Sequence, residues 1–343
     1  MPYVRFGPSL KVRRTLERAL SGRPPERSEA YGLCYVEGPD LWALLEAAGR
    51  LRDRYRGRLV TFSRKVFIPL TNLCRDRCAY CTFVRAPGEP GARTLSPEEV
   101  LALARAGEKL GCKEALFSLG DRPEARYPRY RAWLRSQGYT STLDYLRAVC
   151  ALVVERTGLL PHANPGVMTE AEMTGLRPFN VSMGLMLENV SQRLLRPGMA
   201  HYRCPDQVPA LRLRTIAAAG RLKVAFTTGI LVGIGETPEE RVDSLFAIQE
   251  LQQASGHIQE VIIQNFRPKA GTPMAGHPAP DLGEMLRTIA VARLILQDMN
   301  IQAPPNLAPA DYRLYLWAGV NDWGGISPLT PDFINPEAPW PKL

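Results

Sequence analysis

The chain has 343 residues, of which 45% are hydrophobic and 22% charged, as in a globular protein large enough for one α/β barrel or two ordinary domains. No apolar run approaches the roughly 18 residues of a membrane span, and the amino-terminal segment lacks the features of a secretory signal, so we expect a cytoplasmic protein. The net charge of +9 comes from scattered arginines, which argues against a nucleic-acid-binding stripe and leaves a solvated surface or attraction to an acidic electron-donor protein.

The first 60 residues predict a helical extension that precedes the main fold. Its clearest part is the run LWALLEAAGRLRDRYRG, which has the apolar spacing of an amphipathic helix and ends at Gly57. We expect the main fold over residues 61–327 and a proline-rich tail over residues 328–343, extended and packed on the main fold.

From residue 65 onward, short apolar runs alternate with helical patterns, as in βα units around a parallel sheet. The helices begin at polar caps followed three residues later by glutamate: Ser96 with Glu99, Thr169 with Glu172, Thr237 with Glu240 and Asp281 with Glu284. The candidate strands are residues 65–70, 114–119, 161–165, 181–187, 223–231, 259–265, 301–304 and 319–326. Eight such units predict a complete (β/α)8 barrel, and an open six-strand barrel is the alternative because the last two strands are weakly marked.

Reactive groups of a barrel collect at the carboxyl ends of its strands. Cys74, Cys78 and Cys81 follow the first predicted strand in the run TNLCRDRCAYCTF. This CxxxCxxC spacing lets three thiolates of one loop hold three irons of a 4Fe-4S cluster and leaves the fourth iron open for a small chelating ligand. A structural zinc site usually takes four ligands, and no second cysteine pair or histidine lies nearby. The loop therefore predicts an iron–sulfur cluster.

The remaining cysteines and histidines indicate no second site. An odd total of seven cysteines favours a reducing compartment over a disulfide framework. Cys112 and Cys150 fall on apolar patterns typical of a core, and Cys34 and Cys204 have no evident partner. We expect His201, which faces either substrate or solvent, in a surface loop. The four histidines are isolated in the sequence: His162, His201, His257 and His277.

Tyr80 stands directly before the third cysteine. The motif CxxxCxΦC, with Φ aromatic, resembles the signature of the radical S-adenosylmethionine (SAM) superfamily, and Tyr80 is then a cofactor contact. The resemblance implies that the amine and carboxylate of SAM chelate the open iron. One electron from the reduced cluster then cleaves SAM to methionine and a 5′-deoxyadenosyl radical, which a barrel interior shields from water.

The same resemblance implies SAM contacts after later strands. Gly120 and Asp121 match a glycine-containing motif at the methionyl amine, or else form a simple turn. Glu188 resembles an acidic residue that binds the ribose hydroxyls, and Arg212 is a candidate partner of the methionyl carboxylate; either is alternatively a solvated charge. The run GILVGIGE resembles the motif GxIxGxxE, whose backbone packs on adenine: Gly229, Ile230, Gly233, Gly235 and Glu236.

Longer strings resemble one family within the superfamily. VFIPLTNLCRDRCAYCTF, KEALFSLGDRPEARYP, FTTGILVGIGET and NDWGGISPLTPDFINPE are similar to those of 7,8-didemethyl-8-hydroxy-5-deazariboflavin synthases. The resemblance implies a radical that abstracts hydrogen from 5-amino-5-(4-hydroxybenzyl)-6-(D-ribitylimino)-dihydrouracil. Cyclisation, loss of ammonia and oxidation then give the chromophore of coenzyme F-420.

The resemblance also implies partners. In actinobacterial relatives this unit is fused to a second radical enzyme, whereas this chain has one cysteine triplet. We therefore expect the stand-alone form and a separate subunit, the 5-amino-6-(D-ribitylamino)uracil–L-tyrosine 4-hydroxyphenyl transferase. Ferredoxin or flavodoxin is the expected electron donor.

A site for this substrate must hold a phenol, a pyrimidinedione and a polyol. Polar residues at predicted strand ends suit these groups, although each has a structural alternative: Asp121, Arg122, Asn164, Asn265, Arg267, Asn306, Asn321 and Asp322. No side chain is assigned a catalytic role beyond the cluster and SAM.

Two other functions stay open from the sequence. A related radical synthase would act on a menaquinone precursor or insert sulfur as biotin synthase does, although the latter usually needs ligands for a second cluster. A protein of a different class would be an iron–sulfur electron carrier. Formation of 5′-deoxyadenosine separates the enzymes from the carrier, because a carrier yields none.

Overall fold

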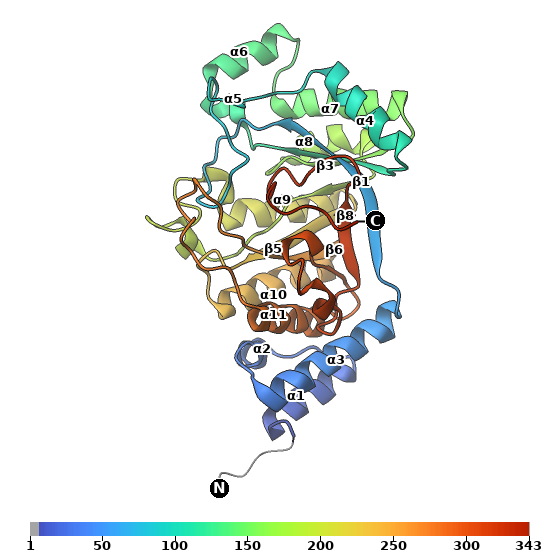
Figure 1. Ribbon diagram of the computed structural model, residues 1–343, viewed down its shortest axis with the longest axis vertical. Coiled ribbons are helices and arrows are strands. Elements are labelled where there is room, and N and C mark those ends of the chain that lie inside the picture. Colours follow the sequence, from blue (N-terminus) through green and yellow to red (C-terminus); the bar gives the residue numbers. More distant parts are fainter. Residues whose placement is uncertain (1–6, 343) are drawn as a thin grey trace.

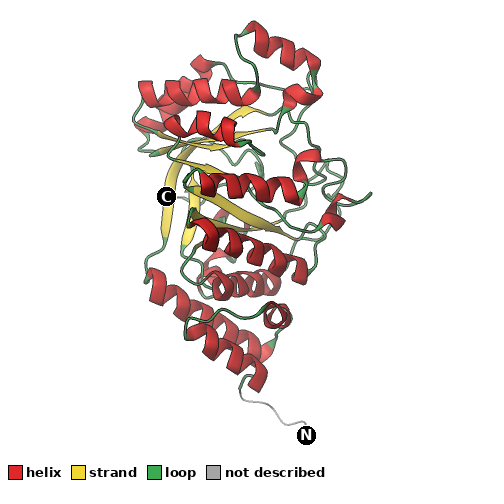
Figure 2. Cartoon of the chain, turned by 180° about the vertical axis from the view of Figure 1, so that it is seen from behind, coloured by secondary structure: helices red, strands yellow, loops and turns green. Residues whose placement is uncertain are grey.

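The structure, a computed structural model, describes residues 7–342. Eight parallel strands pair in chain order and close into a barrel (Figure 1). Figure 2 shows the helices outside the strands. The closed barrel confirms the (β/α)8 prediction, and the six-strand alternative is wrong. The strands are β1 Thr61–Thr71, β2 Glu114–Leu119, β3 Leu160–Asn164, β4 Ser182–Gly184, β5 Phe226–Val232, β6 Ile258–Asn265, β7 Asn300–Gln302 and β8 Asp322–Ile326.

The helices begin where the capping patterns predict. The side chains of Ser96, Thr169 and Thr237 each cap a helix, and the backbone N–H of each cap residue donates to the glutamate side chain three residues later. Asp281 accepts a bond from the Glu284 N–H. The helices are α1 Leu10–Leu20, α2 Arg27–Leu33, α3 Gly38–Arg56, α4 Pro97–Lys109, α5 Pro123–Arg126, α6 Pro128–Ser136, α7 Thr142–Arg156, α8 Glu170–Leu176, α9 Pro209–Arg221, α10 Pro238–Ser255 and α11 Leu282–Leu296. Short 3-10 helices are η1 Arg177–Phe179, η2 Gln192–Leu195, η3 Pro205–Gln207, η4 Pro305–Leu307 and η5 Tyr312–Leu316.

Strand β1 shows how each strand divides its side chains between two faces. Val66, Ile68 and Leu70 are fully buried in the apolar core, and Gly107 of α4 packs directly against Val66. The alternate residues Lys65 and Phe67 point into the barrel, where they line a cavity. The helix-facing residues therefore form the core, and the inward residues are available to build a site.

The amino-terminal extension packs beside the last helices of the barrel. Helix α3 contacts α11, and α2 contacts α10. Helices α1, α2 and α3 form the lower end of the molecule in Figure 1. Gly57 ends α3 with a φ of +67°, as predicted. The division at residues 60 and 327 stays a prediction, and residues 1–6 and 343 of its outer segments lie outside the described residues.

The carboxyl-terminal tail closes a gap in the upper wall of the barrel. β8 pairs with β1 only as far as Arg64, so among residues 7–342 no strand pairs with residues 65–71 of β1 on that side. There the Phe67 N–H donates to Thr330 Oγ1 at 2.9 Å, and the Trp340 ring stacks on Phe67 with centroids 5.1 Å apart. The tail thus forms part of the wall at this point.

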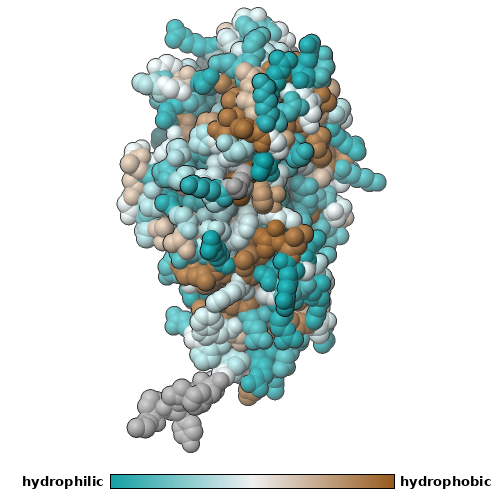
Figure 3. All heavy atoms as spheres, turned by 45° about the vertical axis from the view of Figure 1, so that its right-hand side comes forward, coloured by the Kyte–Doolittle hydropathy of each residue, from teal (hydrophilic) through white to brown (hydrophobic). Residues whose placement is uncertain are grey.

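The surface mixes apolar and polar side chains. Figure 3 shows apolar patches interrupted by hydrophilic residues on one face. Among residues 7–342 no helix has both the length and the apolarity to cross a membrane. Such a mixture is ordinary on a globular protein, because more than half of its accessible surface usually comes from apolar atoms.

Candidate active site

The inward side chains enclose a cavity of about 340 Å³ in the barrel. Its mouth is lined by the cysteine loop and the carboxyl ends of the strands, and part of its wall comes from tail residues 332–335 and Trp340. Cys74, Cys78 and Cys81 all line it. The structure therefore brings the predicted cysteine loop to the edge of the barrel where reactive groups collect.

The cysteine loop is anchored on β2. Gly120, which follows β2, lies so close to the loop that a Cβ there would overlap the Leu73 carbonyl oxygen and lie 2.6 Å from the Cβ of Cys74. The next N–H, of Asp121, donates to Cys74 Sγ at 3.2 Å. Only glycine fits at position 120, because its backbone lies in direct contact with the backbone of the cysteine loop at Leu73.

The three thiols suit a cluster. Burial raises the pKa of Cys74 and of Cys81, and the neighbouring thiol of Cys204 together with burial raises that of Cys78. Because iron binds thiolate, loading a cluster must release protons. Within residues 7–342 no three His, Cys, Asp or Glu side chains gather tightly enough for a single metal ion. Three cysteines of one loop suit a cube in which each thiolate holds a different iron.

Three carboxylate oxygens near the loop have no hydrogen-bond partner among the described residues. They belong to Asp76, Asp121 and Glu188, and all three side chains line the cavity. Burial raises the pKa of Asp76 to about 6 and that of Glu188 to about 7, and it raises that of Asp121 well above its ordinary value. Buried polar atoms are normally paired, so these oxygens indicate a polar ligand.

Arg212 is a buried cation at this end of the cavity. It is 5% exposed, and its guanidinium donates to the carbonyls of Met186 at 2.8 Å and Asp206 at 3.1 Å. The alternative of a solvated charge is therefore wrong for Arg212. Its remaining N–H groups are left for a ligand, because a guanidinium has five.

The Tyr80 hydroxyl contacts His201, which the sequence analysis predicted to lie in a surface loop. His201 Nε2 lies 3.1 Å from the Tyr80 hydroxyl, and both residues are buried. Burial lowers the pKa of His201 to about 3, so the imidazole is neutral. The prediction of a surface position for His201 is wrong, because the residue is buried. The sequence did not indicate this burial, because Tyr80 lies 121 positions away along the chain.

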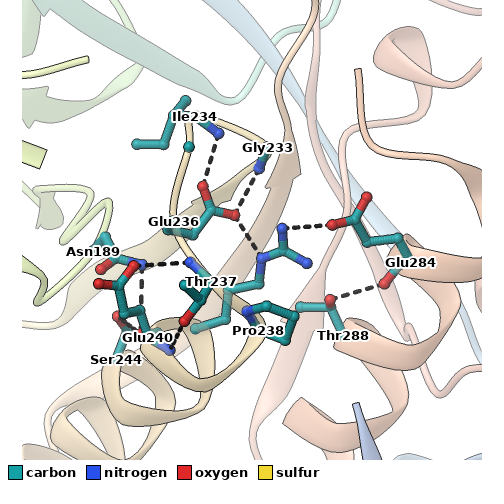
Figure 4. Close-up of polar contacts among 12 residues, drawn as sticks. Asn189, Gly233, Ile234, Glu236, Thr237, Pro238, Glu240, Ser244, Glu284 and Thr288 are labelled. Atoms are coloured by element: carbon teal, nitrogen blue, oxygen red, sulfur yellow. Dashed lines mark hydrogen bonds and ion pairs between the residues drawn. The ribbon is translucent and has the colours of Figure 1, made fainter. Parts of the chain in front are cut away.

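The fifth-strand motif lies behind the cavity wall. The carboxylate of Glu236 accepts the N–H groups of Gly233 at 2.7 Å and Ile234 at 2.8 Å (Figure 4) and pairs with Arg241 at 2.5 Å. Gly233 and Gly235 have φ of +96° and +99°, which glycine tolerates. These contacts fix the turn after β5; a contact of this motif with adenine stays a prediction.

Gly229 and Ile230 support a site residue through the backbone. The Glu188 N–H donates to the Gly229 carbonyl at 3.1 Å, and Glu188 forms a parallel bridge with Ile230. A Cβ on Gly229 would overlap the Ile262 carbonyl oxygen of β6. The motif thereby holds Glu188 at the cavity in a left-handed conformation, with a φ of +63°.

The structure brings four of the predicted substrate residues to the cavity: Asp121, Asn164, Asn265 and Arg267. Arg122 instead pairs with Glu172 at 2.7 Å, and Asn306 donates to Asp332 of the tail at 3.1 Å. Asn321 and Asp322 lie opposite the mouth, because β8 begins at Asp322 and runs toward the mouth as far as Ile326. Asn321 there accepts bonds from Arg293 and the Ile301 N–H.

Sequence reasoning missed the closed end of the cavity. Lys65, His162, Thr227, Glu260 and Gln302 line it, each on a different strand. Their signal was present as polar residues at alternate positions of predicted strands, a period that places them on the inward face. Which of those positions meet in space follows only from closure of the barrel.

Comparison with known proteins places this geometry in a class. The model of the radical SAM superfamily matches residues 68–248. Fold and site therefore define a radical SAM enzyme, and this class has a 4Fe-4S cluster and SAM as its cofactors. The three thiols and the unpartnered carboxylate oxygens of the cavity fit both groups.

Curated relatives narrow the class further. The 7,8-didemethyl-8-hydroxy-5-deazariboflavin synthase of Methanopyrus kandleri is 53% identical over 285 residues, which cover 83% of this chain and 85% of the relative. The FO synthase of Nocardia farcinica is 54% identical over 344 residues, covering 97% of this chain. The chain belongs to the family of 7,8-didemethyl-8-hydroxy-5-deazariboflavin synthases. It spans about 40% of the length of the FO synthases that it matches.

Solved structures agree on the fold. Methylornithine synthase (PylB) superposes with a TM-score of 0.73 at 22% identity and covers 93% of this chain and 87% of its own. HydG, a maturase of the [FeFe]-hydrogenase, gives a TM-score of 0.77 at 17% identity and covers 92% and 68%. At these identities the likeness concerns the barrel alone.

Proposed function

We propose that this chain closes the deazaflavin ring. Its substrate is 5-amino-5-(4-hydroxybenzyl)-6-(D-ribitylimino)-dihydrouracil, and its products are ammonia and 7,8-didemethyl-8-hydroxy-5-deazariboflavin (FO), the chromophore of coenzyme F-420. The two electrons lost by the adduct are balanced by cleavage of one SAM to methionine and 5′-deoxyadenosine. The enzyme is then a carbon–nitrogen lyase. Support comes from family membership and from the polar cavity inside the barrel.

One observation carries the proposal. Three thiols, three unpartnered carboxylate oxygens and the buried Arg212 share the mouth of a single cavity, and that cavity extends beyond them into the barrel, where residues of the strands line it. The mouth offers groups for a cluster and an amino-acid cofactor, and the interior offers room for a separate organic substrate.

The residues divide into roles at the mouth. Cys74, Cys78 and Cys81 each hold one iron, and the cluster with SAM supplies a hydrogen-abstracting radical when bound. Asp121 accepts a hydrogen bond from the methionyl amine of SAM, and Arg212 donates hydrogen bonds to the methionyl carboxylate. Tyr80, Gly120 and Glu188 complete the cofactor site. Behind them lie Gly229 and Ile230 of β5, and Gly233, Gly235 and Glu236 of the turn after it.

The protein also keeps water from the radical. The tail crosses the open part of the wall, where Lys269 donates to the Ile334 carbonyl at 2.9 Å. Asn164, Asn265 and Arg267 line the interior and are the substrate contacts that we retain from the sequence. Exclusion of water limits side reactions of a reactive intermediate.

Partners follow from the chemistry. A separate 4-hydroxyphenyl transferase subunit supplies the adduct, and ferredoxin or flavodoxin supplies the electron to a protein of net charge +9. All seven cysteines are free, which supports a reducing, cytoplasmic compartment.

The test is anaerobic reconstitution with iron and sulfide, followed by addition of SAM, dithionite and the chemically defined adduct. We expect 5′-deoxyadenosine, ammonia and a fluorescent deazaflavin to appear together and only with adduct present. Deoxyadenosine without deazaflavin would indicate another radical synthase. No deoxyadenosine under any condition would indicate an electron carrier.

A further inference from the structure

The closed end of the cavity is polar, although the interior of a barrel is normally packed with apolar side chains. Five residues form it, and we call them the floor: Lys65, His162, Thr227, Glu260 and Gln302. Lys65 and Glu260 also line a small polar cavity at the amino-terminal ends of the strands, together with Glu114 and Asp322. The floor therefore lies at the far end of the cavity from the cysteine loop.

The floor is partly satisfied and partly open. Lys65 Nζ pairs with Glu114 Oε2 at 3.1 Å, Thr227 Oγ1 donates to Glu260 Oε1 at 2.8 Å, and His162 Nδ1 lies 2.7 Å from Ser182 Oγ. The second oxygen of Glu260, His162 Nε2 and the amide of Gln302 have no hydrogen-bond partner within residues 7–342. Donors and acceptors thus remain for a ligand.

Three glycines make room for these side chains. A Cβ on Gly324 would overlap the Gln302 amide, one on Gly325 would lie 2.8 Å from Lys65 Cδ, and one on Gly184 would lie 3.0 Å from His162 Nε2. Burying a lysine, a glutamate and a histidine in a barrel is unfavourable unless their contacts compensate. Burial and the Lys65 charge lower the pKa of His162 to about 3, so it is a neutral donor or acceptor.

Between floor and mouth the cavity wall is apolar and partly aromatic. Phe67, Leu116, Ile262 and Trp323 line it. Flat apolar walls suit aromatic and heteroaromatic rings. Ring closure joins the phenol to the pyrimidinedione, so both rings must lie beside the cofactor at the mouth and in this middle section. The ribityl chain takes no part in bond formation and is free to extend away from the cofactor.

We propose that the floor is the subsite for the ribityl chain of the substrate, with Lys65, Glu260 and Gln302 bonding its hydroxyls. This inference rests on the proposed function and adds to it the orientation of the substrate. Each hydroxyl both donates and accepts, which matches a floor that offers an ammonium, a carboxyl and an amide. The orientation places the polyol at the closed end and the reacting rings at the open end.

Equilibrium binding of the product tests the floor without turnover. FO is fluorescent, so its affinity for cluster-loaded protein is measured by fluorescence anisotropy, beside that of a deazaflavin carrying methyl in place of ribityl. We expect the wild type to bind FO at least tenfold more tightly than the methyl compound. Lys65→Met and Glu260→Gln should lose about tenfold in affinity for FO and leave affinity for the methyl compound within twofold.

Two controls separate recognition from misfolding. Lys113→Met makes the same change on an exposed side chain next to β2 and should bind both compounds as the wild type does. Gln302→Leu removes no charge and should also lose affinity for FO alone. Circular dichroism and iron content confirm that each variant is folded and loaded.

The outcomes distinguish the two levels of the proposal. A wild type that makes FO yet binds FO and the methyl compound equally overturns the floor subsite alone. Floor variants that weaken both compounds equally, or neither, do the same. A wild type that binds neither compound and makes no FO overturns the proposed function together with the subsite.

Discussion

The N–H of Asp121 donates a hydrogen bond to Sγ of Cys74 across 3.2 Å. This bond joins the end of strand β2 to the cysteine loop that follows strand β1. The adjacent Gly120 brings the two segments into contact, since no Cβ fits between it and Leu73. Hydrogen bonds to cluster thiolates also influence reduction potential. The geometry of the cysteine loop thus depends on a neighbour 47 positions away.

Replacing Gly120 with alanine should disturb this loop. The added Cβ would collide with the Leu73 carbonyl and the Cys74 side chain, so the loop must move. We expect reconstituted Gly120→Ala to hold less than about half of the wild-type iron and sulfide. Gly32→Ala is the matched control, because Gly32 has open space around it in α2. Equal cluster content in both variants would show that the loop does not need this contact.

Glu188 should make stability depend on pH. Its pKa is raised to about 7 in the folded protein, first by burial, so between about pH 4.5 and 7 the folded chain binds a proton that the unfolded chain has released. The stabilising contribution of the protonated carboxyl is present below that range and is lost as the pH rises through 7. Relative to Glu188→Gln, the cluster-free wild type should lose on the order of 1–3 kcal/mol of unfolding free energy from pH 5 to 8. The free energies of unfolding are measured by urea denaturation at both pH values. An equal change from pH 5 to 8 in the wild type and in Glu188→Gln would contradict this prediction.

Glu236 should matter for stability. Its carboxylate accepts two backbone N–H groups and pairs with the buried Arg241, which also pairs with Glu284 at 2.6 Å. Glu236→Gln should lower the free energy of unfolding by about 3 kcal/mol, because it leaves a buried cation with one partner. Glu155→Gln, which breaks an exposed pair, should cost less than about 1 kcal/mol. Urea unfolding followed by circular dichroism measures both, and equal effects would refute the structural role of the turn.

Trp340 should keep the ratio of deoxyadenosine to FO low, because it helps to exclude water from the radical. Its ring stacks on Phe67 and its Nε1 donates to the Thr330 carbonyl at 3.0 Å, which holds the tail across the open wall. Trp340→Ala should admit water and raise the ratio of deoxyadenosine to FO several-fold, measured by chromatography. Trp42→Ala removes an exposed tryptophan of α3 and should leave the ratio unchanged. An unaltered ratio in Trp340→Ala would mean that the tail does not shield the site.

Local signals predicted much of the fold. β2 occupies the residues expected, and the caps at Ser96, Thr169 and Thr237 stand where the sequence placed them, because capping and strand periodicity act over a few residues. β4 is shorter than expected, and a strand of three residues carries too little periodicity to set its bounds.

Long-range contacts explain what the sequence could not predict. His201 was assigned to the surface because its bond to Tyr80 joins distant segments. Asn321 and Asp322 were counted among the polar residues at strand ends, but the end at which they lie is the amino-terminal end of β8, opposite the mouth. The floor stayed hidden for a related reason: Lys65 and Glu260 meet only when the first and sixth strands share a closed barrel.

The most direct measurement is the response of the cluster to SAM. In anaerobically reconstituted, dithionite-reduced protein we expect about four irons and four sulfides per chain. Its electron paramagnetic resonance spectrum should shift on addition of SAM, and 5′-deoxyadenosine should form once the adduct is also present, whereas Cys78→Ala should show neither while remaining folded. A wild-type protein without iron and sulfide, or a cluster whose spectrum ignores SAM because a fourth side chain already occupies the last iron, would contradict an open iron held by Cys74, Cys78 and Cys81.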